Sequence, residues 1–386
     1  MEILKIYEND GHSKEFEAKV LACEAADGGR YAVVLDKTSF FPEGGGQAAD
    51  TGVLGGAKVL DVKEKDGIPV HFTDSPLEVG AEVHGEIDYA TRFRRMQNHS
   101  GEHIVSGIVN RLYGYNNVGF HMGEDDITID FDGVLDRAQL CEVERLANEA
   151  VVANRKILVS YPDPETLATL EYRSKKALEG RVRIVEIEGF DRCACCAPHL
   201  AMTGEVGIIK ILDFIHYKGG VRVHLLCGFD ALEDYHRRYE ATKAVSELLS
   251  VPQSDVVGGV EALQVECGRL RGELGELKRR LMDFRAAEVK ECEGNICIFE
   301  NVEANLARYL VNACVDKCGG VCGVFSGDDD AGYKYIIAAR RPGLRSAAKE
   351  INTALGGRGG GSDEMIQGSI TATAERIIEY FEGFTL

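Results

Sequence analysis

The first part of the chain alternates between short apolar runs and turn-forming residues. Residues 33–35, 59–62 and 83–87 are rich in Val, Leu and Ile, and polar or glycine-containing segments separate them. Runs of this length between turn residues are typical of half-buried strands. We therefore predict a β-rich domain over residues 1–90.

The next region, residues 91–232, mixes helical and strand-like patterns. Apolar side chains at helical spacing predict helices over residues 92–112 and 138–154. Strand-like patterns follow at residues 126–131, 207–211 and 221–225. We therefore expect a mixed α/β domain here.

Beyond Pro252 the pattern changes to an apolar seam with alternating steps of four and three residues. The seam consists of Val256, Val260, Leu263, Cys267, Leu270, Leu274, Leu277, Leu281 and Phe284. This is an a/d heptad pattern, which is weakened by glycines at 268, 272 and 275. It predicts a helical coiled-coil arm over residues 233–291, either as a hairpin within the chain or between two chains.

The last part, residues 292–386, is globular in its pattern. Residues 295–299 and 335–339 are strand candidates, residues 356–362 are expected to form a glycine loop, and residues 370–381 a closing helix. The whole chain is therefore expected to be an α+β protein with four regions.

Composition narrows the classes of function. The formal net charge of −19 argues against nonspecific binding of nucleic acid through bulk charge, so a nucleic-acid partner would need a local basic patch. We find no apolar run long enough to span a bilayer and no signal peptide, and therefore expect no membrane association. Twelve cysteines without an export signal favour a reducing cytoplasm, where they are free thiols or metal ligands.

The strongest chemical signal is a pair of ligand-like doublets. His99 and His103 are spaced i, i+4, so they lie on one face of the predicted helix. Cys195 and His199 have the same spacing in a cysteine-rich turn. Three imidazoles and a thiolate form a ligand set that Zn2+ accepts, and ligands from distant segments suit a site that lines a cleft. Cys193 and Cys196 are rival ligands; the spacing favours Cys195, and Cys196 is expected to be a packed thiol.

Other candidates are less specific. Glu102 lies beside a ligand histidine, where it could orient an imidazole or move a proton, although a solvated surface glutamate is an equal alternative. The glycines at 44–46 followed by Gln47 form either a simple turn or a substrate lip, with Thr38 upstream. The last group could contact a phosphate backbone, and comprises Arg340, Arg341, Arg345, Arg358 and Gly359.

Taken together, these motifs resemble the editing half of alanyl-tRNA synthetase and the freestanding alanyl-tRNA editing proteins of the long form. The family pattern is matched in order, by residues 40–47 with 50–52, by His99 and His103, and by residues 195–199, 203–207, 218–222 and 356–368. The chain departs from it where residues 196–198 are Cys-Ala-Pro in place of Gly-Gly-Thr. It also departs where residues 100–102 are Ser-Gly-Glu in place of Thr-Ala-Thr.

The resemblance implies a fold and an activity. It implies a β-barrel-like N-terminal domain, a zinc-binding editing domain, a helical arm and a small C-terminal domain of the DHH-associated kind. Because the chain begins directly in the β domain, we expect it to lack aminoacylation. The expected reaction is hydrolysis of tRNA(Ala) wrongly carrying serine, or glycine, with Zn2+ either activating a water or anchoring the substrate.

The resemblance also suggests roles for individual residues. An editing pocket can select the serine hydroxyl by hydrogen bonding it, because alanine would leave that buried partner unpaired. Thr38 is the expected contact, and Gln47 is expected to position the aminoacyl end. Alternatives are a different zinc hydrolase, a non-catalytic tRNA-binding protein with structural zinc, and an editor of another misacylated tRNA. A homodimer through the seam or the C-terminal domain is a further possibility.

Overall fold

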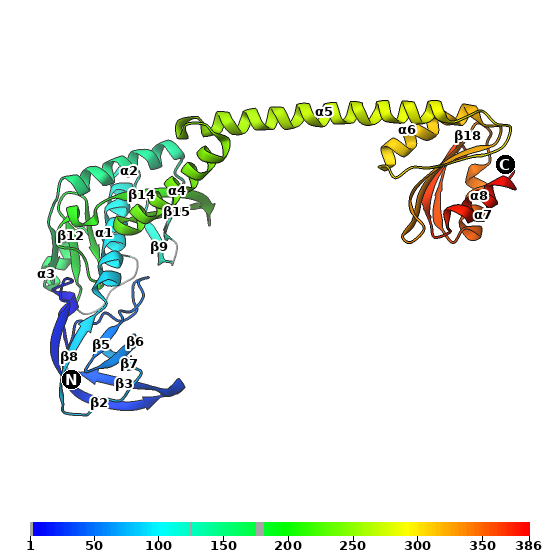
Figure 1. The fold of residues 1–386 in the computed structure, drawn as a ribbon. Coiled ribbons are helices and arrows are strands. Elements are labelled where there is room, and N and C mark those ends of the chain that lie inside the picture. The colour runs from blue at the N-terminus through cyan, green and yellow to red at the C-terminus, as the bar shows by residue number, and fades with distance from the viewer. Residues whose placement is uncertain (1–2, 124–125, 175–180) are drawn as a thin grey trace. The chain divides into compact units, whose positions relative to one another are not determined.

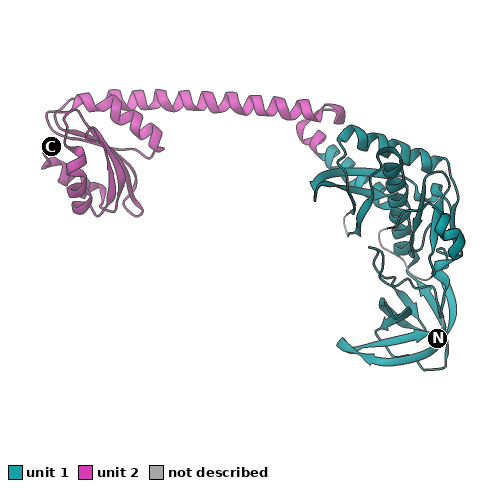
Figure 2. Cartoon of the chain, turned by 180° about the vertical axis from the view of Figure 1, so that it is seen from behind, with its two compact units in different colours: residues 1–244 teal, residues 245–386 magenta. Residues whose placement is uncertain are grey.

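The computed structural model describes residues 3–123, 126–174 and 181–386, which form a mixed α+β protein as expected (Figure 1). It divides into two compact units, residues 1–244 and 245–386 (Figure 2). No helix in these described ranges combines the length and apolar character needed to cross a membrane.

Unit 1 begins with the predicted β-rich domain. Its strands are β2 (Glu15–Ala26), β3 (Arg30–Leu35), β5 (Gly52–Leu54), β6 (Ala57–Lys65), β7 (Ile68–Thr73) and β8 (Glu82–Ile87). They pair in the order β2-β3-β7-β6-β5-β8, and β8 pairs back onto β2 to close the ring. Phe16, Ala18 and Val20 alternate with exposed residues along β2 and point into the core. Outside the ring, β1 (Leu4–Lys5) pairs in parallel with β4 (Lys37–Thr38).

The second domain of unit 1 is built around a long buried helix, α1 (Tyr89–Tyr113). The Asp88 side chain caps its N-terminus by accepting from the Thr91 amide, and Gly114 ends it in the left-handed conformation (φ 74°). The surrounding helices are α2 (Arg137–Val152), α3 (Pro164–Thr169) and α4 (Gly228–Leu249).

Two sheets accompany α1. The larger has the order β14-β15-β10-β9, and the smaller β11-β12-β13. The strands are β9 (Asn117–Met122), β10 (Ile127–Phe131), β11 (Ile157–Ser160), β12 (Ile184–Ile187), β13 (Asp191–Ala194), β14 (Ile209–Tyr217) and β15 (Gly220–Cys227). Met96, Ile104 and Ile108 of α1 belong to the same buried cluster as Ile129 and Val223 of the larger sheet. The predicted helix and strands of this region are thus confirmed.

A buried ion pair joins α1 to the loop that follows β4. Arg92, which is fully buried, donates from Nε to both carboxylate oxygens of Asp50 at 2.9 Å. Its terminal nitrogens also donate to the carbonyl oxygens of Ser39 and Gly11. Asp50 in turn accepts from the Phe41 amide at 2.6 Å. The guanidinium therefore fixes both the 39–50 loop and the segment around Gly11 against α1.

Unit 2 contains a five-stranded sheet with helices on both faces. The strand order is β16-β17-β18-β20-β19. The strands are β16 (Ile296–Phe299), β17 (Val321–Asp328), β18 (Gly332–Ala339), β19 (Arg358–Gly361) and β20 (Met365–Ile370). The helices are α5 (Val256–Glu288), α6 (Ala304–Cys314), α7 (Leu344–Ala354) and α8 (Ala374–Glu382). One buried cluster joins α5 and α6 to the sheet, and another joins α7 and α8 to its opposite face.

Two local predictions in unit 2 were wrong. The expected glycine loop at 356–362 contains strand β19, which pairs with β20. A Cβ on Gly359 would lie 2.3 Å from the Gln367 carbonyl oxygen, so the missing side chain permits close strand approach rather than a loop. The closing helix begins at Ala374 and not at Ile370, because Ile370 is the last residue of β20.

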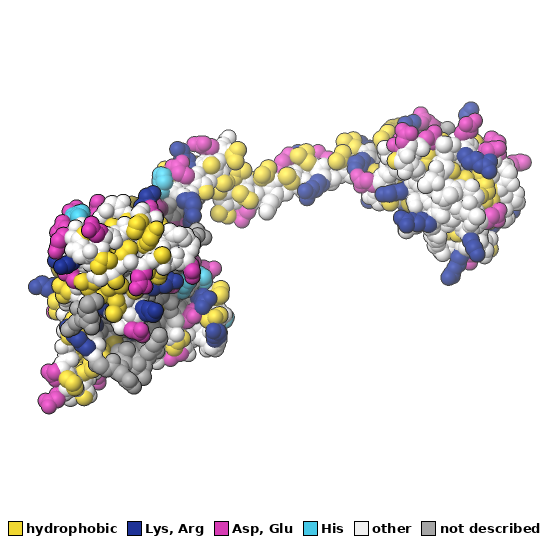
Figure 3. Space-filling model, turned by 90° about the horizontal axis from the view of Figure 1, so that it is seen from below, with side chains coloured by type: hydrophobic (Ala, Val, Ile, Leu, Met, Phe, Trp, Pro, Cys, Tyr) yellow, Lys and Arg dark blue, Asp and Glu magenta, His cyan; other side chains and the backbone are white. Residues whose placement is uncertain are grey.

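The heptad seam lies on a single continuous helix, α5. Helix α6 packs on another side of α5, through Met282 and Ala286, and leaves the seam uncovered. From Val260 to Phe284, the apolar side chains of the seam are 40–72% exposed (Figure 3). Within the described residues, therefore, no hairpin buries this seam.

Folding of the barrel should respond to pH through His71. This ring is fully buried; its Nδ1 donates to the Val33 carbonyl oxygen (3.1 Å) and its Nε2 accepts from Thr38 Oγ1 (2.8 Å), which is the neutral form. Burial lowers the pKa of His71 from 6.5 to about 4.

Between pH 6.5 and about 4, the unfolded chain therefore binds a proton at His71 that the folded chain excludes. We expect unfolding free energy to fall by about 3 kcal/mol as pH drops from about 6.5 to 4. Urea titrations across this pH range measure the fall in unfolding free energy. The fall should be smaller in His71→Gln. The same pH dependence in His71→Gln as in the parent chain would contradict the assignment to His71.

Candidate metal centre

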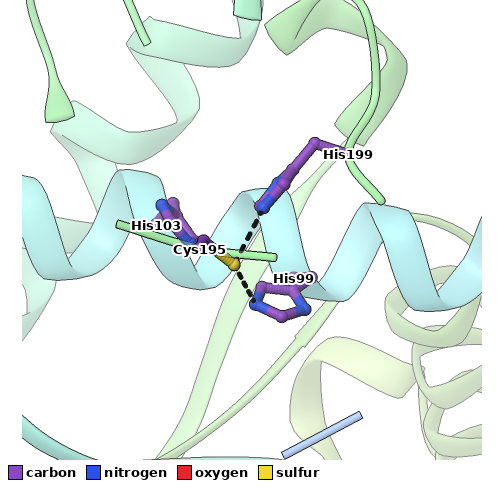
Figure 4. Close-up of side chains that lie close together, drawn as sticks. All are labelled: His99, His103, Cys195 and His199. Carbon is purple, nitrogen blue, oxygen red and sulfur yellow. Dashed lines mark hydrogen bonds between the residues drawn. The ribbon is translucent and has the colours of Figure 1, made fainter. Parts of the chain in front are cut away.

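The four predicted ligands converge in the structure. Ligand atoms of His99, His103, Cys195 and His199 all lie within 4.8 Å of one another (Figure 4). Cys195 Sγ is 3.5 Å from His99 Nε2 and 3.4 Å from His199 Nε2. Helix α1 supplies two imidazoles, and the turn after β13 supplies the thiol and the third imidazole. The donor set can hold a metal ion, and its residue types fit the zinc that the sequence predicts.

Each imidazole of the cluster has its own partner at Nδ1. Gln47 Oε1 lies 2.9 Å from His99 Nδ1, Asp191 Oδ2 lies 2.9 Å from His103 Nδ1, and Ser100 Oγ lies 3.2 Å from His199 Nδ1. A partner that accepts at Nδ1 fixes the tautomer whose Nε2 lone pair is available to a metal. The Nε2 atoms of all three histidines therefore remain available as metal ligands.

Asp191 supports His103 rather than serving as a ligand itself. Together with His103 and Cys193, Asp191 forms a second group of close metal-ligating atoms. However, both Asp191 oxygens already accept hydrogen bonds from Arg173, at 2.7 and 2.8 Å. Burial works against ionisation of Asp191, but His103 and Arg173 hold the pKa of this carboxyl below its usual value. The ionised carboxylate therefore anchors the imidazole from behind.

Glycines let the elements of the site approach closely. A Cβ on Gly101, between the two ligand histidines, would lie 2.3 Å from Cys227 Sγ. A Cβ on Gly107 would lie 2.3 Å from the Phe190 carbonyl oxygen and 2.7 Å from Asp191 Cβ. The absence of side chains at these positions brings α1 against β15 and the 190–191 segment. Gly107 therefore helps to place Asp191 behind His103.

The ligand turn is held by a buried arginine. Arg183 donates to the carbonyl oxygens of Cys195 (2.7 Å) and Ala197 (2.9 Å). Cys196, one of the two rival cysteines, was expected to be a packed thiol, and this was wrong, because its side chain is exposed. It is the buried Cys193 that is packed. The turn directs Cys195 inward and its neighbour outward.

The cluster favours a thiolate among imidazoles. Burial alone would raise the pKa of the Cys195 thiol, but the three surrounding imidazoles lower it well below its ordinary value. Burial lowers the pKa of His199 to about 3, which keeps this ring neutral. A thiolate and a neutral imidazole are the forms that bind metal ions.

A cavity of about 370 Å³ opens onto the cluster. Gly45, Gly46 and Phe120 line it opposite the ligands, so the glycine run forms a wall of the cavity and not a remote turn. A Cβ on Gly46 would lie 2.6 Å from the Phe120 carbonyl oxygen, and its φ of 87° also requires glycine. The barrel-domain loop and the second domain thus enclose one cavity.

Glu102 is buried and also lines this cavity. Its Oε1 accepts from Ser106 Oγ (2.7 Å) and from the Asn117 amide. Its Oε2 lies 3.8 Å from His103 Nε2. The solvated surface alternative for this glutamate is therefore wrong, and the carboxylate belongs to the site.

The other predicted residues do not line this cavity. Thr38 is fully buried beside His71 and is not among the residues that line the cavity. Gln47 reaches the site through His99, and its Nε2 has no hydrogen-bond partner among the described residues. In unit 2, Arg340 pairs with Asp316 at 2.5 Å, whereas Arg358 and Gly359 are exposed on β19.

Sequence reasoning missed the residues that support the ligands. Asp191, Arg173 and Arg183 have no motif of their own, and they reach the cluster from segments that only the fold brings together. Ser100 lies between the two ligand histidines, but its partner His199 is 99 positions away. The one available signal was Asp191, four residues before Cys195 in a cysteine-rich segment.

Two family profiles match parts of unit 1. Residues 6–91 match the family profile of class II (A) tRNA synthetases, and residues 182–224 match that of the second additional domain of threonyl and alanyl tRNA synthetases. These matches cover the barrel and the ligand turn. The second match contains two of the four candidate ligands, Cys195 and His199.

Over nearly its whole length the chain is similar to alanyl-tRNA editing proteins. It is 28% identical to AlaX-L of Pyrococcus horikoshii, over 97% of this chain and 96% of that protein. It is 26% identical to Aarsd1 of Danio rerio, over 96% and 94%. The resemblance inferred from the motifs is therefore confirmed. The alanine–tRNA ligase of Halobacterium salinarum is 34% identical over 85% of this chain, but the match spans only 38% of the ligase.

The close approach at Gly101 predicts an unusual response to alanine. Replacing a mid-helix glycine with alanine normally stabilises a helix by about 1 kcal/mol. At Gly101 the added Cβ would collide with Cys227, so we expect Gly101→Ala to destabilise unit 1 by about 1–3 kcal/mol. Gly272→Ala is the matched control, because no atom lies within 4 Å of a Cβ there. Thermal melts should shift in opposite directions; stabilisation by Gly101→Ala would contradict the packing argument.

Proposed function

We propose that this protein is a trans-editing hydrolase that deacylates tRNA(Ala) wrongly carrying serine, and also glycine. The observation that carries the proposal is the composite cavity, in which a four-ligand cluster faces a glycine wall from another domain. The similarity to proteins named for alanyl-tRNA editing gives the substrate class. The fidelity problem is physical, because a synthetase pocket for alanine cannot strongly reject serine.

We propose Zn2+ as the metal, bound by His99, His103, Cys195 and His199. Three imidazoles with fixed Nε2 lone pairs and one thiolate match the ligand types and the number that zinc prefers. Bound zinc would supply Lewis-acid polarisation of a water or of the substrate carbonyl. Twelve free cysteines and this thiolate ligand favour a reducing compartment, and we place the protein in the cytoplasm on that basis.

Other residues of the site orient the ligands, transfer a proton and exclude water. Gln47, Asp191 and Ser100 hold the three imidazoles in the ligand tautomer. Glu102 accepts a hydrogen bond from Ser106 at Oε1, and its Oε2 lies 3.8 Å from His103 Nε2. We propose that Oε2 accepts the proton of the attacking water and then donates it to the leaving ribose oxygen. Gly45, Gly46 and Phe120 exclude bulk water from one side of the cavity.

Serine selection requires a hydrogen bond to the substrate hydroxyl. We proposed Thr38 for this contact, but Thr38 Oγ1 already bonds His71 and accepts from the Phe40 amide. Contact between Thr38 and substrate would therefore require the Thr38–His71 hydrogen bond to open. The unpartnered Nε2 of Gln47 is the donor nearest in sequence to the glycine wall, and it is the candidate for positioning the aminoacyl end.

Hydrolysis assays test the proposal directly. Ser-tRNA(Ala) and Ala-tRNA(Ala) are incubated with the full chain, metal-loaded or treated with a chelator. We expect rapid, metal-dependent loss of serine with alanine spared, and loss of activity in Cys195→Ala. Asp191→Asn should lower metal affinity or activity by about 10–100-fold, because it removes a ligand's carboxylate partner. Binding of tRNA with no turnover would instead indicate a non-catalytic tRNA-binding protein. Full activity in zinc-free Cys195→Ala would rule out the metal mechanism.

We further propose that unit 2 contacts the tRNA phosphate backbone. Arg358 and Gly359 lie on the edge strand β19, and Arg341 follows β18 with an exposed side chain. Arg340 would have to exchange its bond to Asp316 for a phosphate. Lys or Arg contacts of this type weaken with salt, so binding should lose affinity steeply between low and physiological ionic strength.

We propose a homodimer through the heptad seam. The seam runs along α5 from Val256 to Phe284, which is 28 steps along the helix, or about 42 Å at 1.5 Å per residue. Its exposed leucines match the a/d repeat of a coiled coil. In sedimentation equilibrium, we expect the full chain to be dimeric and Leu274→Glu to be monomeric. Val265→Glu, on the opposite side of α5, is the control and should stay dimeric. A monomeric parent chain would refute the dimer.

A further inference from the structure

Five cysteines gather in unit 2, far in sequence from the metal centre. Cys297 lies on β16, Cys314 on α6 and Cys322 on β17, and the other two, Cys292 and Cys318, lie in the segments that precede β16 and β17. No three of these thiols lie close enough together to form a metal cluster in the described residues. Their arrangement therefore has to be explained in another way.

Cys292 and Cys318 face each other across a parallel β-bridge. The Cys292 amide donates to the Lys317 carbonyl oxygen (2.9 Å), and the Gly319 amide donates to the Cys292 carbonyl oxygen (3.1 Å). These two bonds set the two cysteines in register as direct neighbours. Bridged residues on adjacent strands are about 4.8 Å apart and project from the same face. This separation falls inside the window of about 4.4–6.8 Å that a disulfide requires between Cα atoms.

The accessibility of the two thiols gives them distinct roles. Cys292 is exposed and Cys318 is half-buried, whereas Cys314 and Cys322 are buried. Burial, with a smaller contribution from the nearby Cys292, raises the pKa of Cys318. Cys292 is therefore the thiol that an oxidant in solution reaches first. Cys318 is the neighbouring thiol that can then attack the oxidised Cys292 sulfur. The buried thiols do not compete.

We propose that Cys292 and Cys318 form a reversible disulfide, a redox modification site separate from the metal centre. The oxidant is a small-molecule disulfide such as oxidised glutathione. The Cys292 thiolate attacks one sulfur of glutathione disulfide, forms a mixed disulfide and releases one glutathione thiolate. The Cys318 thiolate then attacks Cys292 Sγ, closes the protein disulfide and releases the second glutathione. Both thiol protons go to the released glutathione, so the protein loses two electrons and glutathione disulfide gains them.

The bond would covalently join two segments that are now held together by hydrogen bonds and by packing against a common buried cluster. Residues 289–295 connect α5 to β16, and residues 315–320 connect α6 to β17. Beyond the bridge, Lys317 Nζ already donates to the carbonyl oxygens of Ala286 and Val289 at the end of α5. The disulfide would lock the end of α5 to the sheet of unit 2. A dithiol reductant would release it.

Peptide mapping of the full chain tests the proposal. The protein is treated with oxidised glutathione, its free thiols are alkylated, and it is cleaved with trypsin and a glutamyl protease. Cleavage after Glu293 separates Cys292 from Cys297, and fragmentation spectra separate Cys318 from Cys322. We expect a linked Cys292–Cys318 peptide that a dithiol removes.

Two variants make the outcome decisive. In Cys318→Ser the linked peptide should vanish, and Cys292 should be recovered as its mixed disulfide with glutathione. Cys297→Ser is the matched control, because it removes the half-buried thiol five residues after Cys292 and should leave the linkage intact. Glutathione retained on Cys292 of the parent chain, without linkage, would overturn the proposal. So would a disulfide to Cys297, Cys314 or Cys322.

Discussion

The buried pair between Arg92 and Asp50 is the interaction on which the site depends. It lies where the first turns of α1 meet the loop after β4, and both side chains are fully desolvated. Removing one partner of such a pair leaves an uncompensated buried charge, at a cost of about 3–5 kcal/mol. The same helix carries His99 and His103 two and three turns further on, and the same loop carries the glycine wall. One guanidinium therefore fixes the ligand helix and the cavity wall in a common frame.

The sequence predicted the parts of this protein whose physics is local. The helix expected over residues 92–112 and the strand runs of the barrel appear where the spacing of apolar residues predicted them. The metal ligands could be found because i, i+4 spacing places two imidazoles on one helix face whatever surrounds them. The heptad seam also lies on one helix, as its period requires.

Long-range packing decides what the sequence could not show. Asp191 supports His103 only because Gly107 lets two segments meet, and no local pattern records that contact. The glycines at 359–361 are a strand because β20 lies beside them, although their composition favours a loop. Glu102 could be read as a surface residue until Asn117 and Ser106 were seen to hold it inside. In each case a residue from another segment, adjacent only in the folded structure, overrides the structure that the local sequence favours.

The origin of the ligands also determines when the centre can exist. His99 and Cys195 are separated by 96 positions, and the glycine wall lies about fifty positions before His99. Closing such long loops costs chain entropy that only the finished packing returns. A ribosome that has synthesised the barrel and α1 has made two ligand imidazoles and the glycine wall, but neither Cys195 nor His199. The metal centre therefore cannot form before residues 195–199 have been made, and a chain truncated before them carries only half of the ligand set.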